Sequence, residues 1–151
     1  MLPLTHSFPL HTHRRLYRLY LFGYDGGNAE SCCALEKSES AFQRRLQELD
    51  LRFHAIYSGF LASERQIGIV SDFIRTFRRS DTLVVIDPVM GDDGKAYQTY
   101  TSALCSGMTH LAELADVITP NLTEAAFLLG RPYDQLPQEE AGLQELVREL
   151  G

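Results

Sequence analysis

Short apolar runs alternate with amphipathic stretches along most of the chain. Runs of the kind that form buried strands occur at 54–61, 82–91 and 116–122. Stretches with apolar residues at helical spacing are found at 35–49, 64–78, 101–115, 123–129 and 138–150. This alternation indicates βαβ units, and therefore an α/β fold with a parallel sheet and right-handed crossovers. The unbroken apolar run at 82–91 predicts a strand that is covered on both faces.

Residues 1–30 lack this regularity. Leu and Tyr alternate there with Arg and His without a clean period, and glycines interrupt the stretch near its end. Residues 16–22 have β-propensity and predict a strand. We therefore divide the sequence into an atypical segment, 1–30, and a regular body, 31–151, which we interpret as part of one domain.

Composition and charge exclude several classes of function. The 151 residues are 44% hydrophobic and 23% charged, which is typical of an ordinary globular protein. The net charge of −6 argues against nucleic-acid and anionic-membrane partners, because both favour a basic surface. Three cysteines without metal-ligand spacing predict a reducing compartment. No apolar run approaches the ~20 residues of a membrane span, and no signal peptide is recognisable, so we expect a cytoplasmic location.

Polar side chains follow each predicted strand. Ser58, Asp87 and Asn121 stand at or just beyond the ends of the three apolar runs, and Glu124 comes three residues after Asn121. Because ligands of open α/β sheets bind beyond the carboxyl ends of the strands, we expect these residues along one rim. Asp87 has an equally good interpretation as a turn-initiating residue before proline.

Two interpretations of Asn121 and Glu124 remain open from the sequence. Their spacing is that of a helix capping box. The same pair could instead order the hydration shell of a Mg²⁺ ion that carries ATP phosphates. No Walker-type glycine-lysine motif is present, and the five histidines have no metal-ligand arrangement. Cys105 lies on an apolar helix face and is expected to be a small core residue.

Three stretches in order resemble pyridoxal kinases: AIYSGFLASERQIGIVSDFI, VVIDPVMGDDGKAY and DVITPNLTEAAFLLG. The resemblance covers residues 53–130. A DPVMG word followed by G-K-x-Y is quite specific to vitamin B6 kinases. PNLTEA is shared with the hydroxymethylpyrimidine kinases of thiamine synthesis, which do not usually carry GDDGKAY after DPVM. These kinases are therefore the closest alternative.

The resemblance implies a fold, a reaction and roles for individual residues. The fold would be a ribokinase-like three-layer sandwich with a mainly parallel central sheet, incomplete in this chain. The reaction would be transfer of the γ-phosphoryl group of ATP to the 5′-hydroxyl of pyridoxal, pyridoxine or pyridoxamine, with ATP and Mg²⁺ as cofactors and a homodimer as the assembly. Residues by the nucleotide would be Asp87, Thr119 and Glu124. Residues near magnesium would be Asn121 and Glu124. Residues of a lid over ATP would be Asp92, Asp93, Gly94, Lys95 and Tyr97. Residues near the substrate would be Ser58 and Gly59.

Two family segments have no counterpart in the sequence as written. The family's glycine-rich turn, reading like G-T-G-D, supplies the aspartate that activates the substrate hydroxyl, and it does not occur here. We therefore assign no catalytic residue and expect this chain to be inactive alone. The alternatives are a kinase completed by another chain and a non-catalytic nucleotide-binding protein.

The second segment reads like THTGGFTGYTF and contacts the substrate. Back-translation of HTHRRLYRLYLFGYDGGN, with suitable codons and a shift of one nucleotide, can give THTGGFTGYTFLDMTEE. We hypothesise that residues 1 to about 30 are an out-of-frame version of that segment. The hypothesis fails if the shifted frame of the coding DNA does not spell it.

Overall fold

The computed structural model describes residues 43–50 and 52–151. Its centre is a parallel sheet in the order β1-β2-β5, with bounds Ala55–Ser58, Leu83–Ile86 and Val117–Ile118. Tyr57 pairs with Val85, which in turn pairs with Val117. The three strands match the three predicted apolar runs, and the α/β class with a parallel sheet is confirmed.

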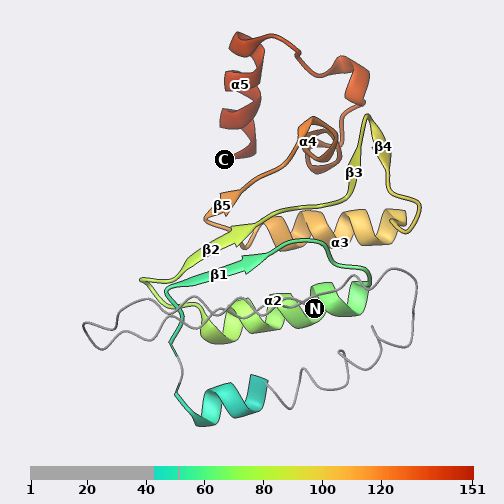
Figure 1. Ribbon diagram of the computed structural model, residues 1–151. Coiled ribbons are helices and arrows are strands. Elements are labelled where there is room, and N and C mark those ends of the chain that lie inside the picture. The colour runs from blue at the N-terminus through green and yellow to red at the C-terminus, as the bar shows by residue number, and fades with distance from the viewer. Residues whose placement is uncertain (1–42, 51) are drawn as a thin grey trace, which may run out of the picture.

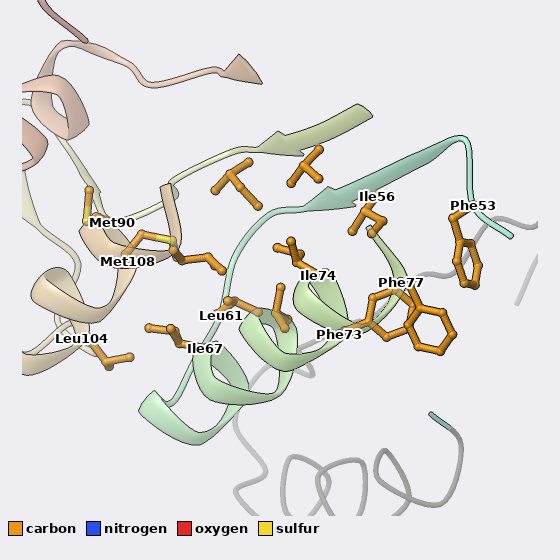
Figure 2. Close-up of a cluster of buried hydrophobic side chains, with 14 of the residues drawn as sticks. Phe53, Ile56, Leu61, Ile67, Phe73, Ile74, Phe77, Met90, Leu104 and Met108 are labelled. Atoms are coloured by element: carbon orange, nitrogen blue, oxygen red, sulfur yellow. The ribbon is translucent and has the colours of Figure 1, made fainter. Parts of the chain in front are cut away.

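Two helices, α2 (Glu64–Phe77) and α3 (Ser102–Ala112), cover one face of the sheet, and α2 lies along β1 and β2 in Figure 1. Both begin at a hydroxyl N-cap: Ser63 accepts from the backbone of Gln66, and Thr101 from that of Leu104. The main hydrophobic core lies between these helices and the sheet. Figure 2 shows part of this core, including Ile56, Leu61, Ile67, Phe73, Ile74, Phe77, Met90, Leu104 and Met108.

Three phenylalanines close the core at the start of β1. The ring of Phe53 lies 5.4 Å from that of Phe73 and 5.3 Å from that of Phe77, and the last two rings are 4.5 Å apart. Such tilted and edge-on pairs stabilise a core beyond the area that they bury. They lie at the N-terminal end of β1. The opposite edge of the sheet, where the carboxyl ends of the strands meet, is called the carboxyl rim below (Figure 2).

The other face of the sheet is open. Val84 and Ile86 are fully buried, whereas Leu83 is 47% exposed. On the neighbouring strands Tyr57 is 63% exposed and Val117 is 44% exposed. The prediction that residues 82–91 form a strand covered on both faces is therefore wrong for the part of the chain that the structure describes. An apolar run without polar interruptions does not distinguish one buried face from two.

The remaining elements lie on the β5 side. They are the hairpin of β3 (Gly91–Asp92) and β4 (Lys95–Ala96), α4 (Leu122–Leu129), the short 3-10 helix η1 (Tyr133–Gln135) and α5 (Glu140–Leu150). A second, smaller hydrophobic cluster joins α4, η1 and α5. Figure 1 shows the hairpin rising beside α4. This arrangement brings residues 91–96 next to the start of α4.

The predicted helices agree with those found, to within a turn at their ends. Residues 43–48 are helical, which confirms the second half of the helix predicted at 35–49; its first half, the strand at 16–22 and segment 1–30 lie outside the described residues. Cys105 is half-buried against the core, and burial raises the pKa of its thiol. Within the described ranges, no helix is long and apolar enough to cross a membrane.

Candidate functional site

The carboxylate of Asp87 lies between the ends of β1 and β5. Its Oδ2 accepts a hydrogen bond from the hydroxyl of Tyr57 at 3.0 Å, and its Oδ1 accepts one from the hydroxyl of Thr119 at 3.2 Å. The backbone extends the ladder here, because the Asp87 N–H donates to the Ser58 carbonyl and the Thr119 N–H donates to the Ile86 carbonyl. A negative charge is thus held at the carboxyl rim by both neighbouring strands.

The register of the sheet produces this arrangement. Side chains alternate between faces along a strand, so Val85 and Asp87 share the open face. Tyr57 pairs with Val85, and Thr119 follows Val117 by two residues, which places both hydroxyls on that same face. Partial desolvation, followed by the hydrogen bond to Asp87 and its charge, raises the pKa of the Tyr57 phenol. The phenol therefore stays protonated and remains a donor.

The N-terminus of α4 forms the second part of the site. The Asn121 side chain accepts from the Glu124 N–H at 2.9 Å, and the Glu124 carboxylate accepts from the Asn121 N–H at 2.8 Å. This capping box confirms the structural interpretation of the Asn-x-x-Glu spacing. Both side chains also reach the chain after β2: Asn121 Nδ2 donates to the Gly91 carbonyl at 2.9 Å, and the Met90 N–H donates to Glu124 Oε1 at 3.3 Å. The same pair therefore caps the helix and holds residues 90–91.

Glu124 is a buried carboxylate, with only 4% of its surface exposed. Desolvation raises its pKa, two backbone amide donors oppose this shift, and the charges of Asp87 and Asp92 reinforce it. The charges of Asp87 and Asp92 therefore repel a charge on Glu124. A divalent cation bound beside Asp87 would reduce that repulsion.

The tip of the β3–β4 hairpin is fastened to α4. Asp93 and Gly94 have positive φ angles of 48° and 74°, which gives the tight turn between the two strands. The Gly94 N–H donates to the hydroxyl of Thr123 at 2.8 Å, and Thr123 is 1% exposed. A Cβ at Gly94 would come within 2.8 Å of the Tyr133 ring. The lid predicted at 92–97 is thus a hairpin seated on the start of α4 and on η1.

The residues predicted to lie near the substrate, Ser58 and Gly59, place no polar side chain beside Asp87. Ser58 is 7% exposed and alternates onto the covered face, and only its backbone carbonyl contacts Asp87. Gly59 follows directly and is half-exposed. Of the predicted lid residues, Asp92, Asp93, Lys95 and Tyr97 are exposed. The structure therefore brings Asp87, Thr119 and the start of α4 together, and leaves the Ser58 side chain beneath the sheet.

The donor set limits which metal this rim could hold. In the described part of the chain, no group of three His, Cys, Asp or Glu side chains could enclose a metal ion. Mg²⁺ is usually held by one or two carboxylates, its own water molecules and substrate phosphates. The Asp87 carboxylate fits that type of binding, while the side chain of Asn121 is engaged by the Glu124 N–H and the Gly91 carbonyl. These two residues do not fit a site built from protein ligands alone.

Two residues of this cluster were not predicted from the sequence. Tyr57 stands in an apolar run and would be expected in the core, and only the strand register reveals its contact with Asp87. Thr123 was predicted to begin a helix, but its contact with Gly94 spans 29 residues of sequence. The motif GDDGKAY was assigned to a lid through the family resemblance, but its hairpin geometry was not predicted.

A family model described as phosphomethylpyrimidine kinase matches residues 33–151. The chain belongs to the phosphomethylpyrimidine/pyridoxal kinase family. Two curated relatives illustrate the two activities named in this kinase family. A pyridoxine/pyridoxal/pyridoxamine kinase of Bordetella avium is 30% identical over 115 residues, which cover 72% of this chain and 39% of that protein. A hydroxymethylpyrimidine/phosphomethylpyrimidine kinase of Rhizobium meliloti is 30% identical over 102 residues, with coverages of 68% and 37%.

Solved structures of kinases in this family share the fold. A candidate phosphomethylpyrimidine kinase of Bacteroides thetaiotaomicron superimposes with a TM-score of 0.72 at 44% identity, covering 77% of this chain and 40% of that one. Pyridoxal kinase of Lactobacillus plantarum gives a TM-score of 0.65 at 31% identity, with coverages of 76% and 41%. The chain spans 33% to 39% of the length of the curated relatives that it matches. The ribokinase-like fold expected from the sequence is confirmed over that share.

Proposed function

We propose that this chain forms the ATP-phosphate and magnesium side of a vitamin B6 kinase. The whole enzyme would transfer the γ-phosphoryl group of ATP to the 5′-hydroxyl of pyridoxal, pyridoxine or pyridoxamine. The observation that carries the proposal is the Asp87 carboxylate, held by hydroxyls from two strands at the carboxyl rim beside the capping box of α4. A phosphoryl transfer enzyme needs this kind of fixed charge to position a magnesium–triphosphate group.

Each residue predicted on the nucleotide side then has a defined part in binding. Asp87 would contact the hydration shell of magnesium, and Thr119 would orient Asp87. Asn121 and Glu124 would act indirectly, because their polar atoms already hold the helix start and residues 90–91. The hairpin that carries Asp92, Asp93, Gly94, Lys95 and Tyr97 would cover the phosphates and exclude water.

Vitamin B6 is favoured over hydroxymethylpyrimidine as the acceptor. The word GDDGKAY follows DPVM in this sequence, as the resemblance to B6 kinases requires. In addition, the Bacteroides thetaiotaomicron protein, which is 44% identical, was crystallised with pyridoxal. Hydroxymethylpyrimidine is the second candidate, because the matching family model and the Rhizobium meliloti relative carry that activity in their descriptions.

We further propose that this chain alone binds nucleotide without turning it over. Its sequence contains no segment reading like G-T-G-D, to which the family resemblance assigns the base that activates the acceptor hydroxyl. Cytoplasmic location and a homodimeric assembly of the whole enzyme belong to the same proposal.

Isothermal calorimetry of the full chain with Mg·ATP tests the binding role. We expect saturable binding by the wild type and a lower, still measurable affinity in Asp87→Ala. Chromatography of reactions with pyridoxal or hydroxymethylpyrimidine then tests turnover, and no phosphorylated product is expected. Pyridoxal, but not hydroxymethylpyrimidine, should change the affinity for nucleotide. A wild-type chain that shows no saturable binding would overturn the proposal.

A further inference from the structure

A tyrosine on the open face of the sheet contacts the carboxylate that we assign to the magnesium–phosphate group. The hydroxyl of Tyr57 lies 3.0 Å from Asp87 Oδ2, while the Thr119 hydroxyl lies 3.2 Å from Asp87 Oδ1. One oxygen is thus held from β1 and the other from the end of β5. A carboxylate held at both oxygens has lost most of its freedom to rotate.

The setting of Tyr57 indicates that its hydroxyl is not there for packing. The residue is 63% exposed, and its neighbours Ile56 and Ser58 are the ones that enter the covered face. An exposed tyrosine contributes little to a core, so its best-defined interaction is the bond to Asp87. Valine or isoleucine would suit an exposed strand position equally well but could not make this bond.

Conformational freedom that a side chain already lacks in the ligand-free protein does not have to be lost when the ligand binds. A side chain that contacts a hydrated cation gains affinity when it is already in the bound rotamer. The two hydroxyls of Tyr57 and Thr119 provide that restraint in the ligand-free chain.

We propose that Tyr57 is a positioning residue, whose hydroxyl fixes the Asp87 carboxylate in the orientation that receives the magnesium–triphosphate group. This inference rests on the proposed function. Tyr57 does not contact the nucleotide, and its whole effect passes through Asp87. It follows that the effect depends on magnesium, because without the cation the carboxylate only repels phosphate.

Calorimetry of the full chain tests the inference with Tyr57→Phe, which keeps the exposed ring and removes only the hydroxyl. We expect the affinity for Mg·ATP to fall about three- to tenfold, the effect of one hydrogen bond. The thermal unfolding midpoint should stay unchanged. In EDTA, the weak binding of ATP should be the same in both proteins. Thr119→Val should act like Tyr57→Phe, and Thr119→Ser, which keeps a hydroxyl, should restore the affinity.

A double-mutant cycle separates an effect through Asp87 from a direct one. In an Asp87→Asn background, Tyr57→Phe should change the affinity for Mg·ATP by less than about twofold. An equal loss in both backgrounds would overturn the inference, as would equal affinities of Tyr57→Phe and wild type. If the wild type itself shows no saturable binding, the proposed function fails and the positioning role fails with it.

Discussion

Asn121 makes two interactions at the start of α4, and substitutions at this position can separate their contributions to stability. Its side chain accepts the Glu124 N–H, which caps the helix, and donates to the Gly91 carbonyl, which ties residues 90–91 to the cap. Asn121→Ala removes both interactions. An N-cap contributes about 1 kcal/mol, and the bond to Gly91 contributes about 1 kcal/mol more, because that buried carbonyl loses its side-chain donor. We therefore expect Asn121→Ala to lower the free energy of unfolding by about 2 kcal/mol.

Asn121→Ser is the matched variant. Serine keeps the capping acceptor and cannot reach Gly91 as a donor, so only about 1 kcal/mol should be lost. In a chain of 151 residues the alanine and serine variants should melt about 6 °C and about 3 °C below the wild type. Urea unfolding followed by circular dichroism measures both losses. Equal stabilities for serine and alanine would show that the contact with Gly91 is the whole effect, and wild-type stability in alanine would refute the reasoning.

Three further predictions concern charge, backbone and surface. The pKa of Glu124 is raised in the fold, so its contribution to stability is fully present below its ordinary value of 4.5 and is lost as pH rises through the raised value. Glu124→Gln should abolish this decline in urea unfolding over a pH series, and parallel profiles would contradict the assignment. Gly94→Ala should destabilise by about 1–2 kcal/mol, because φ is +74° and the new Cβ meets a tyrosine ring. Gly68→Ala, on a helix with open space around it, should instead stabilise by up to about 1 kcal/mol. Leu83 is 47% exposed on the open sheet face, so we expect the chain to self-associate there and Leu83→Lys to reduce this association in sedimentation experiments. Val147→Lys on α5, at a position that is more exposed still, should leave self-association unchanged; the reverse result would place the contact elsewhere.

The central elements could be predicted because their sequences carry local signals. The apolar runs predicted β1, β2 and β5, apolar residues at helical spacing predicted α2, α3 and α4, and the spacing of Asn121 and Glu124 predicted where α4 begins. The hairpin of β3 and β4 could not be predicted in the same way. Its strands have two residues each, and their pairing depends on the turn at Asp93 and Gly94.

The site was predicted in outline and not in its contacts. Asp87 and Asn121 follow strands, so the rule for parallel sheets placed them on one rim, whereas Thr119 was assigned only through the family resemblance. The partner of Asp87 on β1 depends on register, which the sequence does not encode locally. Ser58 does end β1 at this rim, and strand alternation turns its side chain onto the covered face. Because register is not encoded locally, the contact between Tyr57 and Asp87 could not be predicted either.

Hydrogen–deuterium exchange of the full chain, with and without Mg·ATP, tests the central claim most directly. If the carboxyl rim receives the nucleotide, exchange should slow in residues 87–97 and 119–124. The backbone of α5, at Glu140–Leu150, should exchange at the same rate in both samples. Protection confined to α5, or none at the rim under saturating nucleotide, would contradict the assignment of Asp87 and its neighbours to the magnesium–phosphate group.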